Sequence, residues 1–323
     1  MAKIDFLSLK DFSGEEIGNI IEGAIQIKQA PAKYADALKN KAIALLFQKT
    51  STRTRCSFEA AANQMGATAT YLDWGTTNFT LGNIKDETKC LSQYFDLIIA
   101  RVYFHNDLLL MAEASSVPVI NGLSDFSHPC QALADILTMK ELSGKLKGLK
   151  LAFIGDGNNV CNSLLLSCTK LGIKMAVATP KGYGPKQEIV EYANQFGEVE
   201  ITNNPQQAAE NADYIYTDTW VSMGQEAEAE KRLQAFKNFQ VNSKLVKNGN
   251  SNSMVMHCLP AHRGLEITSE VLDSEKSIAF KQSENRLHAQ KAIMLELLKA
   301  GAKYAELQQK QGEEYAGIVA KTI

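Results

Sequence analysis

Residues 47–59 read F-Q-K-T-S-T-R-T-R-C-S-F-E and gather hydroxyl and guanidinium groups into one short stretch. Five consecutive side chains in it can donate hydrogen bonds to an anion: Ser51, Thr52, Arg53, Thr54 and Arg55. The stretch follows an apolar run at 41–47 and opens a predicted helix, so it lies at a strand-to-helix turn where backbone N–H groups are unpaired. A helix cap needs only one hydroxyl, and the surplus of donors favours a phosphate-binding turn over an exposed cap.

Polar side chains also follow two later apolar runs. Arg101 ends D-L-I-I-A-R, and its guanidinium is either exposed on the surface or a second ligand for a phosphate or a carbonyl group. The sequence S-H-P-C-Q provides His128 and Gln131. The imidazole can donate a hydrogen bond to a carbonyl oxygen that becomes negative during attack, and the amide of Gln131 can hold a neighbouring amide. A buried structural histidine is the alternative, and spacing does not separate the two.

The sequence G-D-G-N-N-V at 155–160 begins like the dinucleotide fingerprint G-x-G-x-x-G. Val160, however, occupies the position of the last glycine, and the next predicted strand ends in A-T-P without an acidic residue to hold a ribose. A nicotinamide site is therefore disfavoured. Asn158 and Asn159 instead offer amide donors and acceptors that suit a small zwitterion.

Two segments near the end of the chain complete the set of chemical groups. The segment D-T-W-V-S-M-G-Q-E at 218–226 offers the carboxylate of Asp218 to an amino group, or else forms a surface turn. The segment at 256–264 places Cys258 directly after an apolar strand. His257, Cys258 and His262 are candidate metal ligands, but successive strand residues point to opposite faces, so we expect no metal. A covalent cysteine remains open, although no base is paired with it in the sequence.

The elements that must position these clusters form two successive series of strands and helices. The first begins with an amphipathic helix capped by Ser13 and Glu16 and has predicted strands near 42–47, 67–72, 96–101 and 117–120. The second follows the glycine-flanked linker 144–148 and has predicted strands near 149–155, 173–178, 198–202, 213–217, 253–258 and 277–280. This alternation predicts an α/β protein with two doubly wound parallel-sheet domains, whose ligands bind in a cleft beyond the carboxyl ends of the strands.

Length, charge and cysteine content exclude several classes of function. The chain has 323 residues, of which 45% are hydrophobic, enough for two packed domains. Its 34 Lys and Arg against 36 Asp and Glu leave a net charge of −2, which argues against nucleic acid or an anionic membrane as a partner. No apolar run is long enough to span a bilayer and no signal peptide is recognisable, so we expect a cytoplasmic protein. The six scattered cysteines predict reduced thiols.

Taken together, S-T-R-T-R, H-P-C-Q, D-G-N-N, D-T-W-V-S-M-G and H-C-L-P-A-H-R-G resemble the motifs of the aspartate/ornithine transcarbamylase family, in order over nearly the whole chain. The first two mark the family in general, and the S-M-G and H-C-L-P motifs mark its ornithine branch. The resemblance implies a carbamoyl-phosphate-binding domain at 1–146, to which a C-terminal helix at 286–323 returns. It also implies an ornithine-binding domain at 147–285 and two interdomain helices, one after His128 and one near 284–299.

The resemblance further implies a reaction and its residues. The neutral δ-amine of L-ornithine attacks the carbonyl carbon of carbamoyl phosphate, giving L-citrulline and phosphate. Carbamoyl phosphate would bind Ser51, Thr52, Arg53, Thr54, Arg101, His128, Gln131 and Arg286. Ornithine would bind Asn159, Asp218, Ser222, Met223, Cys258 and Leu259. Within these sets Arg101, His128, Asp218 and Cys258 would be catalytic, with no metal or cofactor.

The family resemblance also implies a homotrimer with shared active sites. The segment L-G-N-I-K-D at 81–86 is shorter than the family pattern L-G-x-x-E-S-x-x-D, which puts the contribution of a neighbouring subunit in question. Alternatives are a transcarbamylase with another acceptor, such as putrescine or aspartate, a non-catalytic metabolite-binding relative, and a dinucleotide oxidoreductase. Arginine biosynthesis and arginine breakdown both remain open.

Overall fold

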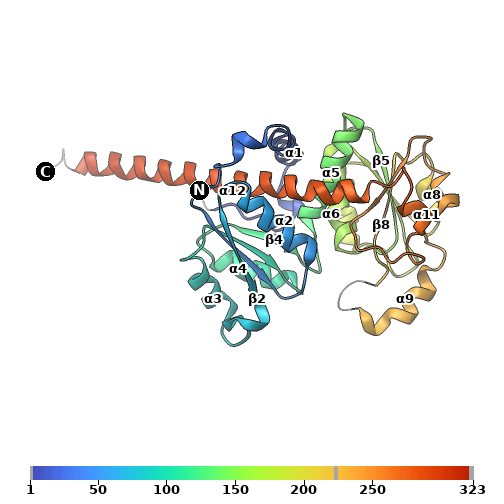
Figure 1. Ribbon diagram of the computed structural model, residues 1–323, viewed down its shortest axis with the longest axis horizontal. Coiled ribbons are helices and arrows are strands. Elements are labelled where there is room, and N and C mark those ends of the chain that lie inside the picture. The colour runs from blue at the N-terminus through green and yellow to red at the C-terminus, as the bar shows by residue number, and fades with distance from the viewer. Residues whose placement is uncertain (1–2, 222–224, 320–323) are drawn as a thin grey trace.

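The computed structural model describes residues 3–221 and 225–319 of the chain, which form two parallel β-sheets with helices around them (Figure 1). The first sheet has the order β2-β1-β3-β4 and the second the order β7-β6-β5-β8-β9. The strands of the first sheet are β1 (Ala42–Phe47), β2 (Thr68–Asp73), β3 (Leu97–Arg101) and β4 (Val119–Leu123). Those of the second are β5 (Lys150–Ile154), β6 (Lys174–Ala178), β7 (Val199–Thr202), β8 (Tyr214–Thr217) and β9 (Met254–His257). The predicted α/β class and the two parallel sheets are confirmed.

Helices connect the strands, as parallel pairing requires. Around the first sheet they are α1 (Gly14–Gln29), α2 (Thr52–Asn63), α3 (Ile84–Leu91), α4 (His105–Ala114) and α5 (Pro129–Ser143). The remainder are α6 (Asn159–Cys168), α7 (Gln187–Asn194), α8 (Pro205–Ala209), α9 (Ala229–Phe236), α10 (Ser243–Val246), α11 (Ser269–Leu272) and α12 (Ala279–Val319). Short 3-10 helices are η1 (Leu9–Asp11), η2 (Pro31–Tyr34), η3 (Trp74–Thr76), η4 (Asn78–Thr80), η5 (Thr169–Leu171) and η6 (Glu226–Glu228).

Local sequence explains where the first helix begins and which face it buries. The Ser13 hydroxyl accepts from the backbone N–H of Glu16, and the Glu16 carboxylate accepts from that of Ser13, so the predicted capping box is confirmed. Ile17, Ile20 and Ala24 follow at helical spacing and are buried.

The strand order fixes where each sheet opens toward a ligand. In the first sheet β1 pairs with β2 on one side and β3 on the other, and in the second β5 pairs with β6 and β8. The connections that leave neighbouring strands in opposite directions create a crevice at their carboxyl ends. The turns after β1, β3, β5 and β8 therefore lie where a ligand is expected.

Two helices join the two halves of the molecule. Eleven consecutive residues of α5, Pro129–Met139, are buried. Helix α12 contacts α5, α1, α2 and β9, and Figure 1 shows it passing both sheets and continuing beyond the first as one helix. The predicted strand at 277–280 is wrong. Ser277 makes only an isolated bridge to Val255, and α12 begins at Ala279 because helical periodicity governs the residues that follow.

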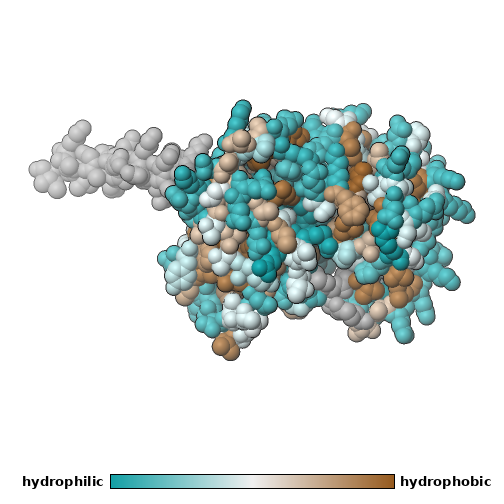
Figure 2. Space-filling model, in the orientation of Figure 1, coloured by the Kyte–Doolittle hydropathy of each residue, from teal (hydrophilic) through white to brown (hydrophobic). Residues whose placement is uncertain are grey.

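The face of the molecule in Figure 2 is mostly polar, with apolar residues scattered over it. Among the described residues, no helix combines the length and apolar character needed to cross a bilayer.

Candidate active site

The polar turn of the first sheet lies where β1 leads into α2. Ser51 is the N-cap of α2, and its hydroxyl accepts from the backbone N–H of Thr54 at 3.3 Å. The expected strand-to-helix turn is therefore present, and Ser51 caps the helix. Thr52 is exposed at the first helical position, and Ser51 and Arg53 are half-buried beside it. The helix start thus presents hydroxyl groups and a guanidinium on the side where the sheet opens.

Thr54 is the point on which two distant arginines converge. Its side chain is fully buried, and its hydroxyl oxygen accepts from Arg286 Nη2 at 2.7 Å and from Arg101 Nη1 at 3.4 Å. Arg101 comes from the end of β3 and Arg286 from α12. Three elements that are far apart in the sequence therefore build one cluster.

The cluster carries an excess of positive charge. Burial, together with Arg286 and Arg53, lowers the pKa of Arg101 to about 10. Burial likewise lowers the pKa of Arg286, with Arg53 adding to the effect. Within the described residues, the Nε atoms of Arg53 and Arg286 are buried without a hydrogen-bond partner. Guanidinium groups crowded together out of water require an anion, and phosphate oxygens match their geometry.

Arg55 does not join this cluster, contrary to the sequence expectation. Its guanidinium lies 3.7 Å from the centre of the Tyr71 ring, and its Nε pairs with Glu59 at 3.0 Å. The helix turn places Arg55 two positions after Arg53, so the two side chains leave α2 in different directions.

His128 and Gln131 lie at the start of α5. Gln131 Oε1 accepts from Arg286 Nη1 at 3.2 Å, which ties the helix to the arginine cluster. His128 is buried, its backbone N–H donates to Ser163 Oγ at 2.8 Å, and its Nδ1 has no hydrogen-bond partner among the described residues. Burial and the three arginines lower the pKa of His128 well below 6.5. The imidazole is therefore neutral and can donate one hydrogen bond to a ligand.

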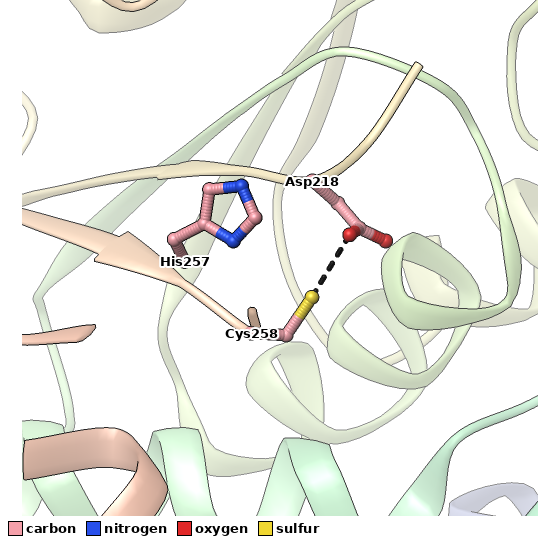
Figure 3. A group of neighbouring side chains, drawn as sticks. All are labelled: Asp218, His257 and Cys258. Carbon is pink, nitrogen blue, oxygen red and sulfur yellow. Dashed lines mark hydrogen bonds between the residues drawn. The ribbon is translucent and has the colours of Figure 1, made fainter. Parts of the chain in front are cut away.

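A second cluster lies where β8 and β9 end (Figure 3). The thiol of Cys258 points at the Asp218 carboxylate and donates to its Oδ1 at 2.9 Å. The same carboxylate accepts from Asn158 Nδ2 at 2.7 Å and from the Thr219 backbone N–H at 2.8 Å. Burial, with Asp218 alongside, raises the pKa of Cys258 well above 9. Cys258 is therefore a protonated thiol and not an activated nucleophile.

His257 and Cys258 do not face opposite sides as predicted, because β9 ends at His257 and strand alternation no longer applies to Cys258. Ligand atoms of Asp218, His257 and Cys258 lie within 4.8 Å of one another. Both nitrogens of His257 are nevertheless engaged, Nδ1 by the Leu259 N–H at 2.9 Å and Nε2 by Glu266 Oε1 at 3.1 Å. Of these three residues only Asp218 and Cys258 could then bind a metal, whereas protein zinc sites use three or four ligands.

The remaining predicted ornithine-site residues lie around this cluster or outside the described chain. Asn159 begins α6, and its Nδ2 donates to the Ser124 carbonyl at 2.6 Å, which links the second sheet to the loop after β4. Leu259 follows Cys258 with a left-handed φ of 59°, uncommon for a leucine and typical of functional turns. Ser222 and Met223 lie outside the described residues.

One residue that supports the segment after β8 was not predicted from the sequence. Arg232 on α9 is buried, pairs with Asp156 and donates from Nε to the Trp220 carbonyl at 2.6 Å. It thereby ties the turn after β5 to the segment that follows Asp218. From the sequence, a basic residue on an amphipathic helix is expected to be exposed to solvent, and only the burial of Arg232 in the structure indicates this role.

Helix α12 connects the two clusters, because Gln282 Oε1 accepts from the backbone N–H of His257 at 2.9 Å and Arg286 lies one turn further along the same helix. The site thus combines three crowded arginines with a carboxylate–thiol pair at the carboxyl end of the second sheet. Two sequence models agree with this division. The aspartate/ornithine carbamoyltransferase carbamoyl-P binding domain matches residues 4–141, and the Asp/Orn binding domain of the same family matches residues 147–297. The chain belongs to the aspartate/ornithine carbamoyltransferase family.

Several members of this carbamoyltransferase family are similar over nearly their full length. The ornithine carbamoyltransferase of Pyrococcus horikoshii is 50% identical over 302 residues, which cover 91% of this chain and 95% of that protein. The anabolic ornithine carbamoyltransferase of Pyrococcus furiosus is 49% identical over 312 residues, or 94% of this chain and 99% of that protein. A solved P. furiosus ornithine carbamoyltransferase superposes with a TM-score of 0.87 at 49% identity, covering 91% of this chain and 96% of that one. The Thermus thermophilus ornithine carbamoyltransferase gives 0.84 at 42% identity, covering 91% and 98%.

Proposed function

We propose that this protein transfers the carbamoyl group of carbamoyl phosphate to the δ-amine of L-ornithine, giving L-citrulline and phosphate. The observation that carries the proposal is the convergence of Arg101 and Arg286 on the buried Thr54 hydroxyl, opposite the Asp218–Cys258 pair. In this proposal residues 1–146, together with the C-terminal residues 286–323, bind carbamoyl phosphate, and residues 147–285 bind ornithine. The family models support the boundary near residue 144, between their matches at 4–141 and 147–297, and the second match continues 12 residues beyond the proposed boundary at 285.

The arginine cluster holds the leaving group. The phosphate of carbamoyl phosphate lies at the start of α2, against the hydroxyls of Ser51, Thr52 and Thr54 and the guanidinium of Arg53. Arg101 bridges the phosphate and the carbonyl oxygen, while Gln131 and Arg286 orient the carbamoyl amide. As the amine attacks, charge grows on the carbonyl oxygen, and donors that are already in place stabilise it without reorganisation.

His128 contributes to the same oxygen as a neutral donor. Because burial and the arginines keep its pKa well below 6.5, it presents an imidazole N–H and not a cation. A neutral imidazole adds a directed hydrogen bond without adding a further charge to a region that already holds three arginines.

The attacking amine must be neutral, although an alkyl amine has a reference pKa of about 10.4. Burial next to three guanidinium groups favours the uncharged form, since like charge and desolvation both lower the pKa of an amine. Asp218 and Cys258 receive the δ-amine, and Asn159, Ser222, Met223 and Leu259 hold the rest of ornithine. When the C–N bond forms, the C–O bond to phosphate breaks and the phosphate departs with the bonding electrons. The proton that the nitrogen loses passes to the departing phosphate, which leaves as hydrogen phosphate.

Assembly and role extend the proposal. The protein forms a homotrimer in the cytoplasm and works in arginine biosynthesis, a direction supported by the anabolic name of its P. furiosus relative. Light scattering on the purified protein tests the trimer. A trimer should have three times the mass of the 35.5 kDa chain, and the mass of a monomer would contradict the proposal.

A panel of acceptors tests the function itself. The purified protein is mixed with carbamoyl phosphate and, in separate reactions, L-ornithine, putrescine or L-aspartate, and the carbamoylated product is quantified. Ornithine should be the preferred acceptor. Preference for putrescine would assign a different acceptor, and no product with any amine would favour a non-catalytic binding protein.

A further inference from the structure

Asp135 is a fully buried carboxyl group on α5 whose hydrogen-bond donors come from three elements. Gln131 Nε2 donates to its Oδ1 at 2.8 Å, and Gln282 Nε2, from α12, donates to the same oxygen at 2.9 Å. The Tyr216 hydroxyl, from β8, donates to Oδ2 at 3.1 Å. Burial raises the pKa of Asp135 to about 6, against these hydrogen bonds and the nearby Arg286. Burying a carboxylate that is paired only with neutral donors is energetically unfavourable, and such groups are often found at functional sites.

The amide groups of Gln131 and Gln282 are oriented in the same way, each with its NH2 end toward Asp135. An amide side chain has a donor end and an acceptor end, whereas a carboxylate accepts only. Because Asp135 binds the donor end of each amide, the acceptor ends are turned outward. Gln131 Oε1 accepts from Arg286 Nη1 at 3.2 Å, and Gln282 Oε1 accepts from the backbone N–H of His257 at 2.9 Å.

Each amide connects Asp135 to a different half of the candidate site. Arg286 donates onward to Thr54 at 2.7 Å, at the start of the anion-binding turn. His257 is the last residue of β9 and directly precedes Cys258, whose thiol binds Asp218. The Tyr216 branch ends on β8, two residues before Asp218. One carboxylate is therefore connected by single hydrogen-bonded side chains to both clusters.

We propose that Asp135 is a positioning residue that sets both substrate half-sites together, by orienting Gln131 toward Arg286 and Gln282 toward the backbone before Cys258. This inference rests on the proposed function. Asp135 does not touch substrate. It fixes which end of each amide faces the site, and thereby couples the geometry of the carbamoyl-phosphate half to that of the ornithine half.

A purely structural role for Asp135 in joining α5 to α12 makes a different prediction, and the chain offers a matched control for it. Thr138 is fully buried three residues further along α5, and its hydroxyl accepts from Asn285 Nδ2 of α12 at 2.9 Å. It therefore makes the same kind of contact between the same two helices, but it binds neither Gln131 nor Gln282 in the hydrogen bonds described. Thr138→Val removes this contact with little change in shape.

Steady-state kinetics and thermal melting of Asp135→Leu, Asp135→Asn, Gln282→Leu and Thr138→Val test the proposal. Asp135→Leu should raise the KM for both substrates by about tenfold, the effect of losing one net hydrogen bond in each half. Asp135→Asn retains one oxygen for both amides and should recover most of this loss. Gln282→Leu should raise the KM for ornithine but change that for carbamoyl phosphate by no more than about twofold, and Thr138→Val should leave both within about twofold.

The proposal is overturned if Asp135→Leu lowers only the melting temperature, as Thr138→Val does, or if it raises the KM of a single substrate. Should Asp135→Leu fail to fold, Gln282→Leu decides, since an equal rise in both KM values would contradict separate branches. A wild-type protein that makes no citrulline refutes the proposed function instead. Calorimetry with inorganic phosphate then remains as the readout, in which Asp135→Leu must bind phosphate more weakly than both Asp135→Asn and Thr138→Val.

Discussion

Replacing Thr54 with valine removes one oxygen atom and leaves the shape of the side chain almost unchanged. That oxygen accepts a 2.7 Å hydrogen bond from Arg286 and a longer one, 3.4 Å, from Arg101. A hydrogen bond to a charged donor contributes about 1.5–3 kcal/mol, and the longer contact adds a small fraction of that. If the loss falls on the transition state, about 2–3 kcal/mol corresponds to a decrease of about 30- to 150-fold in kcat/KM for carbamoyl phosphate.

Thr88→Val is the matched control for this substitution. Thr88 is also fully buried in a helix of the first half, but its hydroxyl donates only to the Ile84 carbonyl one turn earlier. Initial rates of citrulline formation and melting curves are measured for both variants. Thr88→Val should keep kcat/KM close to wild type, and the reasoning is refuted if Thr54→Val retains more than half of the wild-type value or if both variants lose equally.

Three further outcomes follow from the same geometry. Arg53→Ala should reduce activity by about a hundredfold or more with little change in melting temperature. Arg55→Ala, which loses contacts with Tyr71 and Glu59, should remain active. Equal losses of activity in the two variants would indicate that the start of α2 has only a structural role. Because the folded pKa of His128 is depressed, the stability it contributes is present above pH about 6.5 and is lost as pH falls. Wild type should therefore lose more melting temperature than His128→Asn between pH 7.5 and pH 5, and parallel curves would show that His128 does not titrate on unfolding. Iodoacetamide at pH 7.5 should label the exposed Cys56 well before Cys258, as followed by mass spectrometry, and rapid labelling of Cys258 would contradict its protonated, buried state.

Local patterns were sufficient for most of the fold. Alternating apolar runs and helix starts predicted eight strands near their observed positions in the two sheets, because each pattern depends on neighbours a few residues away. The strand predicted at 253–258 is also present, but ends at His257. The prediction failed at 277–280, where a bridge to Val255 gives way after two residues to α12.

The candidate site was predictable in part. The turn at Ser51–Thr54 shows its donors in consecutive residues, so spacing alone indicates an anion site. Arg286 follows Thr54 by more than two hundred residues, and only the resemblance to known motifs connected the two. Asp135 lies four residues after Gln131, a spacing that puts both on one helix face, but nothing local indicates that Gln282 shares the same oxygen.

Arg55 illustrates the opposite error. Composition grouped it with Arg53, yet helix geometry turns the two side chains apart, and an aromatic ring and a glutamate hold Arg55. The alternation rule for His257 and Cys258 failed for a similar reason, since it was applied one residue beyond the end of β9.

We propose that one site joins an anion-binding arginine cluster to an amine-binding carboxylate–thiol pair for carbamoyl transfer. Incubating the protein with ¹³C-labelled carbamoyl phosphate and L-ornithine, and measuring both products, tests it most directly. We expect the label in the ureido carbon on the δ-nitrogen, in an amount equal to the phosphate released. Phosphate release without labelled citrulline, or label on the α-nitrogen, would contradict it.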